Sequence, residues 1–225
     1  MGILSDNIMA GASVSKADPS IAYTHTAVDT TNKSGGGTYT FTSVAIGTAA
    51  TDRLVVVGAM TGAGDVQTIT GITIGGNAAT IVKNQTGGDN AEASIGTYNL
   101  ASGTTTTVVV TFADNPSGCG IGVWAIYDAN HTVSDTGGAA DSSTLSDSLT
   151  VPAGGVVIAV VAQGGNPATV TWTDPGTENF DALIDAGLCH SGASEVYADA
   201  QAPLTVSCAP STSDYNCMAC ATWGP

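Results

Sequence analysis

Apolar and polar residues alternate along much of this chain with a period of two, the spacing of a β-strand that has one face buried. Residues 38–44 show this alternation, and residues 69–74 repeat it more loosely. Residues 54–60 are instead almost continuously apolar, which is typical of a strand covered on both faces. Residues 75–77, Gly-Gly-Asn, tolerate the positive φ of a hairpin turn. The pattern predicts an all-β fold of antiparallel strands.

Further strands are expected wherever short apolar runs lie between turn residues. They cover residues 21–28, 79–82, 94–100, 104–112, 120–127, 148–151, 156–162, 168–173, 194–198, 204–208 and 217–222. One segment differs, because Phe180, Leu183 and Ile184 share a helical face. Gly187 can cap the end of such a helix. We therefore predict a short helix over residues 178–187.

The apolar segments of the first half recur in the second half about 100 residues later. The run at 54–59 corresponds to 156–161, and the Cys119 to Trp124 segment corresponds to the Cys217 to Trp223 segment. Such a period indicates two related structural units that stack. Matched residues are therefore expected to form the scaffold, and a specific binding site is expected where the halves differ.

These observations predict an all-β, antiparallel, jelly-roll-like β-sandwich with an internal pseudo-repeat and an N-terminal arm. The arm and its hinge cover residues 1–37, and the sandwich domain covers residues 38–225. Its halves span about 38–127 and 148–225, and their apolar sets are expected to bury each other. The polar stretch 128–147 crosses between them. The alternative is two small sandwiches in tandem, hinged at 128–147.

The charge balance restricts the class of partner. The chain of 225 residues carries 4 Lys and Arg against 19 Asp and Glu, a net charge of -15. Nucleic-acid binding needs clustered cations that replace the counterions around phosphate, so neither nucleic acid nor an anionic membrane surface is an expected partner. No apolar run approaches the roughly 20 residues of a membrane-spanning helix, and no secretory signal is recognisable. We expect a protein that is made and kept soluble in a cytoplasm until it is assembled or released.

The cysteines are predicted to be buried thiols. Cys217 and Cys220 have C-x-x-C spacing, but residues three apart in a strand point to opposite faces, which opposes shared metal binding. A zinc site would need two more ligands, from Cys189, Cys208 or His190. We therefore predict no metal site among them.

No catalytic signature stands out from the sequence. The histidines His25, His131 and His190 lie in segments that the repeat does not match to one another, and no Gly-x-Ser-x-Gly elbow accompanies them. We expect no enzyme, no catalytic residues and no cofactor. Calcium remains an alternative in two acidic regions, residues 88–90 and the Asp-containing stretch 135–147.

The tryptophans offer an alternative aromatic site. Trp124 and Trp223 occupy matched positions at the ends of equivalent strands, so they are predicted to pack in the core or at its rim. Trp172 has no obvious counterpart in the other half. It is therefore the aromatic residue with most freedom to serve a ligand.

Four segments carry a resemblance to known proteins. Residues 44–57, 72–80, 119–124 and 7–12 resemble β-sandwich proteins encoded among the structural genes of tailed bacteriophages. The motifs are structural and include no catalytic signature. The resemblance implies a non-catalytic virion component, most readily a capsid decoration (cement) protein that docks on major-capsid subunits and bridges them. The alternative is a receptor-binding or glycan-binding module on a tail or fibre.

The resemblance also defines the expected partners. They are the major capsid protein or other virion proteins, together with copies of the chain itself, a trimer being compatible with either role by analogy. We hypothesise that the apolar residues of the arm, Ile3, Leu4, Ile8 and Met9, anchor in a neighbouring subunit. The alternative is that the arm folds back on its own domain.

Overall fold

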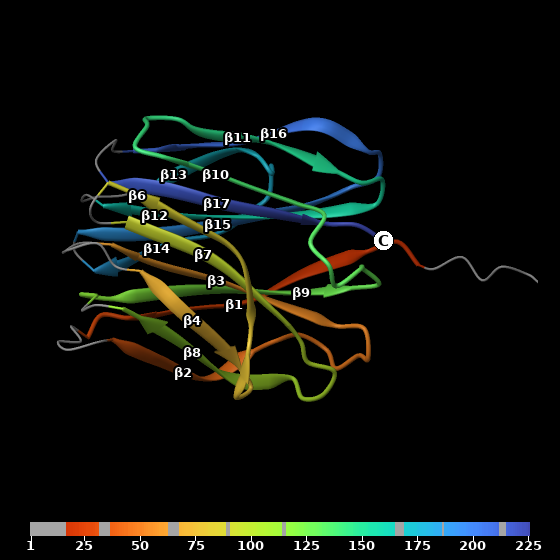
Figure 1. Ribbon diagram of the computed structural model, residues 1–225, viewed down its shortest axis with the longest axis horizontal. Coiled ribbons are helices and arrows are strands. Elements are labelled where there is room, and N and C mark those ends of the chain that lie inside the picture. The colour runs from red at the N-terminus through yellow and green to blue at the C-terminus, as the bar shows by residue number, and fades with distance from the viewer. Residues whose placement is uncertain are drawn as a thin grey trace, which may run out of the picture.

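The computed structural model is a stack of four antiparallel β-sheets (Figure 1). The structure describes residues 17–31, 37–62, 68–88, 91–113, 116–164, 169–185, 187–211 and 215–225. None of these residues is helical. The predicted antiparallel β-sandwich character is therefore confirmed.

Each half of the chain contributes an outer and an inner sheet. In spatial order, the first outer sheet contains β2 (Thr38–Ala45), β8 (Thr105–Phe112), β4 (Ile69–Ile74) and β5 (Asn77–Ala78), and the first inner sheet contains β1 (Ser20–Asp29), β9 (Cys119–Tyr127), β3 (Leu54–Gly62), β7 (Ala91–Asn99) and β6 (Thr80–Gly87). The second inner sheet contains β10 (Asp135–Ala140), β17 (Asn216–Trp223), β12 (Gly155–Gly164), β15 (Leu188–Tyr197) and β14 (Glu178–Asp185), and the second outer sheet contains β11 (Leu145–Val151), β16 (Gln201–Pro210) and β13 (Val170–Asp174).

The predicted repeat is confirmed by the strand order. The inner sheets run β1-β9-β3-β7-β6 and β10-β17-β12-β15-β14, so each strand of one has a counterpart at the same place in the other. The buried tryptophans lie on equivalent strands, because Trp124 of β9 lies opposite Val56 of β3 and Trp223 of β17 lies opposite Val156 of β12. Each unit therefore comprises all the strands of its half, β1 to β9 and then β10 to β17.

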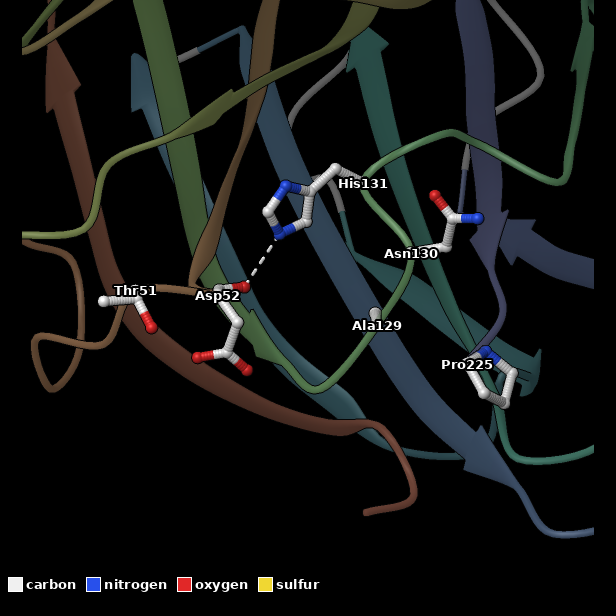
Figure 2. A pocket seen from close by; sticks show the side chains of 6 residues that line it. All are labelled: Thr51, Asp52, Ala129, Asn130, His131 and Pro225. Carbon is white, nitrogen blue, oxygen red and sulfur yellow. Dashed lines mark hydrogen bonds between the residues drawn. The ribbon is translucent and has the colours of Figure 1, made fainter. Parts of the chain in front are cut away.

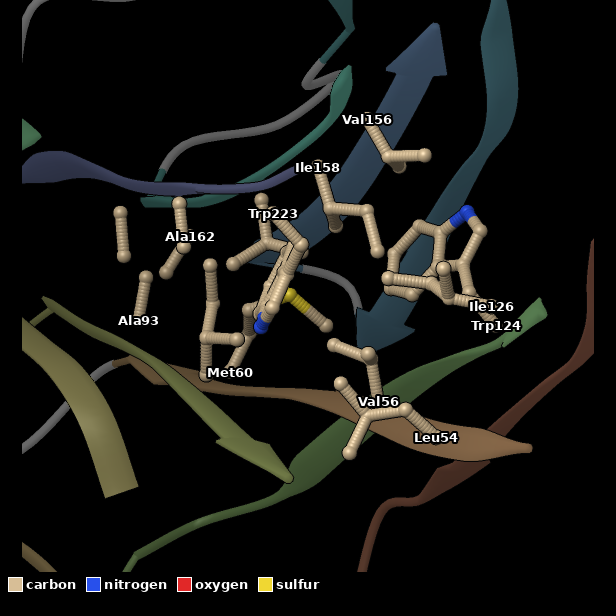
Figure 3. Close-up of a cluster of buried hydrophobic side chains, with 14 of the residues drawn as sticks. Leu54, Val56, Met60, Ala93, Trp124, Ile126, Val156, Ile158, Ala162 and Trp223 are labelled. Carbon is tan, nitrogen blue, oxygen red and sulfur yellow. The ribbon is translucent and has the colours of Figure 1, made fainter. Parts of the chain in front are cut away.

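Three layers of apolar side chains separate the four sheets. On β3, Val55 and Val57 face the first outer sheet, whereas Val56 and Met60 face the second inner sheet. The continuous apolar run is thus covered on both faces, as its pattern predicted. Figure 3 shows the central layer, where β3 and β9 meet β12 and β17. A buried Trp such as Trp124 removes roughly 200 Å² from water, on the order of 5 kcal/mol by area.

The two halves bury their apolar sets against each other, as expected, but each half also closes a two-sheet sandwich of its own. Two strands absent from the prediction explain the difference. The first, β10, lies inside the polar crossover and pairs with β17. The second, β14, pairs with β15. With these strands the inner sheet of the second half has five strands, as that of the first half has, and encloses a core of its own. The strand expected at 21–28 is β1, which pairs with β9 and ties the predicted arm to the stack.

The predicted helix over residues 178–187 is wrong, because this segment forms β14. Phe180 and Ile184 are four residues apart, and an even spacing of four fits both one face of a helix and one face of a strand. Both side chains are buried. Leu183 fits a helical face but not this face of a strand, and its side chain is 50% exposed. Alternation at period two therefore describes this segment.

The cysteines follow the prediction. All five are free and buried. Cys217 packs in the central layer and Cys220 packs toward the second outer sheet, so the C-x-x-C pair points to opposite faces. Burial raises the pKa of Cys220 to about 12, and that of Cys208 to about 12 as well. These thiols serve as small apolar core residues.

Candidate functional site

A polar pocket lies at one end of the stack, where the connection between the halves passes beside the β2–β3 turn (Figure 2). Its cavity has a volume of about 470 Å³. The residues that line it are Thr51, Asp52, Ala129, Asn130, His131 and Pro225. They come from three separate parts of the chain, so the pocket exists only in the folded protein.

Arg53 fixes the loops beneath this pocket. Its guanidinium is fully buried and donates hydrogen bonds to main-chain carbonyls of two neighbouring turns. Nε reaches Leu100 O at 2.8 Å, and Nη1 reaches Gly47 O at 3.0 Å and Gly103 O at 2.9 Å. Nη2 donates to Ser102 O at 2.9 Å. The β2–β3 and β7–β8 turns are thereby held by a rigid fork of donors.

Asp52 joins the β2–β3 turn to the connection between the halves. Its Oδ2 accepts a hydrogen bond from the main-chain N–H of Asp128 at 2.7 Å. Asp128 has a φ of 57°, in the left-handed region that Asp and Asn tolerate best among residues with a side chain. The carboxylate therefore stabilises the sharp turn at which the chain leaves the first half.

His131 is oriented by the same turn. Its Nε2 lies 2.9 Å from the carbonyl oxygen of Asp52, so Nε2 carries the hydrogen and donates. The amide nitrogen of Asn99 lies 3.3 Å from His131 Nδ1 and also donates to Arg53 O at 3.2 Å. Because the imidazole bonds to a main-chain carbonyl and not to a carboxylate, it lacks the acidic partner of a catalytic acid–base pair.

Asn130 completes the wall of the pocket. Its Oδ1 accepts a hydrogen bond from Thr132 N at 3.0 Å, which fixes the plane of the carboxamide. In Figure 2 the Asn130 carboxamide points away from the Asp52 carboxylate, which lies on the other side of the pocket. The two side chains therefore do not converge on one point.

Two buried ionisable groups lie outside this pocket. Glu92 is 1% exposed, its Oε1 accepts Ile69 N at 3.0 Å, and burial raises its pKa to about 7. His190 is fully buried, with its ring centroid 5.0 Å from that of Phe180, and burial lowers its pKa to about 4. Both side chains pack within the stack, so we assign them to the scaffold.

The partner-binding residues predicted from the sequence, Ile3, Leu4, Ile8 and Met9, lie outside the described residues, so their role stays a prediction. The described chain enters the stack beside Gly154, where Asp18 and Pro19 lie close to Pro225. The arm is therefore attached at the same end of the stack as the pocket. The sequence did not indicate that the attachment point of the arm and the pocket share one end of the stack.

The tryptophans belong to the core. Trp124 and Trp223 are fully buried in the central layer, as predicted. Trp172 is 9% exposed, packs between the second inner and outer sheets, and donates from Nε1 to Ser191 Oγ at 2.8 Å. It too is a scaffold residue, and the expectation that it had most freedom to serve a ligand is wrong.

The acidic region considered for calcium is engaged in main-chain hydrogen bonds. Asp135 accepts Thr150 N and Asp147 accepts Gly138 N, each at 2.8 Å. These bonds tie β10 to β11. Residues 89 and 90 of the other candidate loop lie outside the described residues. Within the part of the chain that the structure describes, no three His, Cys, Asp or Glu side chains are grouped to hold a metal ion.

Sequence reasoning missed the pocket, although it named His131 as an isolated histidine. The bond between His131 and Asp52 joins residues 79 positions apart. The only signals available were turn-forming residues around both positions. No local spacing could pair them.

Comparisons with protein-family models, characterised proteins and solved structures find no match to this chain. Among the described residues, no helix has the length and apolar character to cross a membrane.

Proposed function

We propose that this protein is a non-catalytic structural component of a bacteriophage virion, a capsid decoration protein that docks on major-capsid subunits and bridges them. It would be assembled in the host cytoplasm and located in the virion. The observation that carries the proposal is that both broad faces of the stack are uncharged and rich in hydroxyl groups, although the chain has a net charge of -15.

The first face is the outside of the first outer sheet. The described strands of this sheet, β2, β4, β5 and β8, contain no Asp, Glu, Lys or Arg. Its exposed threonines are Thr38, Thr40, Thr42, Thr70, Thr105 and Thr107. The alternation of each strand turns the apolar residues inward and these hydroxyls outward.

The opposite face has the same character. The exposed residues of the second outer sheet include Ser146, Ser148, Thr150, Thr171, Thr173 and Thr205. Its two acidic residues turn inward, since Asp147 accepts Gly138 N of β10 and Asp174 accepts the hydroxyl hydrogen of Tyr197 on β15. The acidic side chains of these strands are therefore kept off the face.

An uncharged face suits docking because burying unpaired charges is costly. Hydroxyl groups can donate or accept, so they adapt to whichever polar groups a neighbour offers. A face of three strands about eight residues long covers roughly 400 Å², about half of the roughly 800 Å² per partner of a standard interface. An apolar arm would supply the remaining area, which gives Ile3, Leu4, Ile8 and Met9 a role.

The stack is also rigid enough to bridge subunits. The central layer joins the two halves through continuous packing of β3, β7 and β9 on β12, β15 and β17. A protein that holds neighbouring subunits at a fixed separation needs such a connection. Packing at native density resists deformation.

The proposal is tested by co-expressing the full chain with the proteins encoded beside its gene and counting its copies in purified particles by quantitative mass spectrometry. Hundreds of copies per particle support decoration of the capsid. A few to a few dozen copies indicate a tail position, and absence from particles contradicts a virion role.

A matched pair of variants tests the face itself. Thr40→Lys places a charge on the first face, whereas Ala200→Lys places the same charge on an exposed turn. We expect Thr40→Lys, or the equivalent Ser148→Lys on the opposite face, to lower occupancy at least tenfold and Ala200→Lys to leave it unchanged. Equal occupancy of all three variants would contradict docking through the faces.

The pocket at the end of the stack favours a second candidate, a receptor-binding or glycan-binding module on a tail or fibre. Its polar groups face outward from an end, where a projecting module would meet its ligand. A low copy number together with binding to host cells would favour this candidate over decoration.

A further inference from the structure

We propose that two copies of this chain pair through the free edge of β2, with Thr38 of one copy opposite Thr40 of the other. Their first outer sheets would then join into one continuous sheet. The inference concerns an edge strand and not the two broad faces, so it stands apart from the virion role.

The direction of the main-chain groups on β2 follows from its pairing with β8. Phe112 N donates to Gly37 O at 2.8 Å, which makes these two residues a hydrogen-bonded pair. In an antiparallel ladder such pairs alternate with pairs that are not hydrogen-bonded. Tyr39 therefore turns its N–H and C=O groups toward β8. Thr38 and Thr40 turn theirs away from β8, toward the edge of the sheet (Figure 1).

These outward main-chain groups are open to a partner. Thr38 and Thr40 are exposed, and within the described ranges no strand or side chain bonds to their N–H or C=O groups. The open stretch ends where the strand bulges, since Ser43 has a φ of 57° and Ala45 O accepts the Thr24 hydroxyl hydrogen at 2.8 Å. The edge therefore has room for a short pairing and not for a long ladder.

The other edges of the stack are protected by charge. Every other described edge strand longer than two residues contains a charged residue: Asp29 of β1, Lys83 of β6, Asp135 of β10, Asp147 of β11, Asp174 of β13 and Glu178 of β14. Charged side chains at an edge discourage pairing with another chain. The strand β2 contains neither a charged residue nor a proline.

Carboxylates also occupy main-chain donors at several of these edges. The bonds are those of Asp147 to Gly138 N of β10, Asp135 to Thr150 N of β11 and Asp181 to Val170 N of β13. An added strand would have to displace them. No such bond protects the outward groups of β2 in the described part of the chain.

The edge of β2 is complementary to itself. When two copies meet about a two-fold axis at Tyr39, Thr38 of each copy lies opposite Thr40 of the other. Each of these two pairs can exchange two N–H···O bonds. Threonine and aromatic residues suit a strand, and opposed threonines pair well across a sheet. An isologous contact of this kind closes on two copies and does not propagate.

Charge favours a second copy as the partner. Each chain has a net charge of -15, so two copies repel each other wherever acidic surfaces face. The described strands of the first outer sheet contain no charged residue, so two copies approach there with the least repulsion. A cationic partner would instead be attracted to the acidic edges at β10, β11 and β14.

Pairing also enlarges the docking face, a consequence that rests on the proposed function. The first face of one copy covers roughly 400 Å². Two joined faces cover roughly 800 Å², the area per partner of a standard interface. The paired edge is therefore a second source of the area that a single copy lacks.

The oligomeric state of the purified full chain tests the pairing. Sedimentation equilibrium over a concentration series from about 1 μM to 1 mM covers weak and moderate affinities. We expect a reversible dimer with a mass twice the 22.1 kDa of the chain. A native chain that stays monomeric throughout the series, or that forms a trimer, would overturn the proposal.

Variants at one position locate the contact. Thr40→Pro removes an outward N–H and no β2–β8 hydrogen bond, so it should raise the dissociation constant of the dimer at least tenfold. Thr40→Val keeps the main-chain groups and is the matched control, which should dimerise as the native chain does. Melting curves establish that both variants are folded. Equal dimerisation by the two variants would contradict pairing through β2.

Two double variants test the register without a proline. Thr38→Glu with Thr40→Lys places opposite charges across the axis and should preserve the dimer. Thr38→Lys with Thr40→Lys places like charges there and should raise the dissociation constant at least tenfold. The two added lysines lower the net charge that makes the chains repel, so a weaker dimer cannot come from total charge. Equal constants for the two double variants would overturn this pairing.

The outcomes separate this inference from the virion role. The sedimentation experiment uses no particle, whereas decoration is measured by copy number in particles. A monomeric chain that still decorates capsids would refute the edge pairing alone. A dimer that is absent from particles would refute the virion role alone.

Discussion

The two halves of this protein share a strand order but are stabilised by different side chains. Strand β7 of the first inner sheet holds the buried carboxyl of Glu92, and the equivalent strand β15 of the second holds the buried imidazole of His190. Glu92 lies opposite Thr61 of β3, whereas His190 lies opposite Ala162 of β12. The repeat therefore preserves backbone pairing and burial, whereas buried ionisable groups belong to one half or the other.

The same backbone requirement is met in two ways. The first residue of β4, Ile69, donates its N–H to buried Glu92 at 3.0 Å, and the first residue of β13, Val170, donates its N–H to exposed Asp181 at 3.1 Å. An edge N–H needs an acceptor in both halves. The carboxylate comes from β7 in the first half and from β14 in the second, so the two halves use different strands for it.

The largest difference between the halves is Arg53, which precedes β3 and has no arginine at the corresponding position before β12. Arg53→Met should destabilise the protein by about 3–5 kcal/mol, because several buried carbonyls lose their donors. Chemical denaturation measures the change. Arg53→Lys retains the charge with fewer donors, so its stability should lie between those of the native chain and Arg53→Met. A loss below about 1 kcal/mol for Arg53→Met would show that water replaces the guanidinium.

Glu92→Gln should produce the next largest change in stability, and only near or above neutral pH. The pKa of Glu92 is raised by burial from its usual 4.5 to about 7 in the folded state, so the folded protein binds the proton more tightly than the unfolded chain. The contribution of Glu92 to stability is present below pH 4.5 and is lost as the pH rises through about 7. Glu92→Gln should raise the melting temperature at pH 8 and change it little at pH 4.5.

His190→Leu should produce the opposite pattern. Burial lowers the pKa of His190 from 6.5 to about 4, so the folded state binds the proton less tightly than the unfolded chain. Its contribution is present above pH 6.5 and is lost as the pH falls through about 4. His190→Leu should therefore remove the fall in melting temperature that His190 causes on acidification from pH 6.5 to about 4. In the native chain the two slopes oppose each other between pH 4.5 and 6.5, and each single variant should expose the other.

Asp181→Asn should have the smallest effect, within about 0.5–1 kcal/mol, because the residue is exposed and an amide oxygen can still accept Val170 N. Hydrogen exchange at Val170 is the relevant measurement. A loss as large as that of Arg53→Met would mean that the stability of the second half depends on the exposed carboxylate of Asp181. The two halves would then not differ in their dependence on a single charged side chain.

Much of the scaffold was predictable because strands covered on one or two faces have distinctive periods. The run at 54–60 and the alternation at 69–74 correspond to β3 and β4. The strand β10 was not predicted, since Asp135–Ala140 has a sequence of low β propensity, Asp-Thr-Gly-Gly-Ala-Ala, and gains its hydrogen bonds from β17. Its glycine at 138 also leaves room for Lys83 and Gln85 of the facing strand.

The site was less predictable than the fold. The pocket depends on the contact between Asp52 and His131, which lie on different turns. A contact between loops that are far apart in the sequence leaves no periodic pattern of residues. The pocket lies at the polar crossover, one of the segments in which the halves differ, and the expectation that a specific site lies there stays a prediction. The identity of the residues required the folded arrangement.

The stacking of four sheets has a consequence for length scale. Packed sheets lie about 10 Å apart, so three intervals separate the two hydroxyl faces by roughly 30 Å. That thickness is set by the volumes of buried valines, isoleucines and tryptophans, which no partner touches. The chemistry of the two faces can therefore change while the distance between them stays constant.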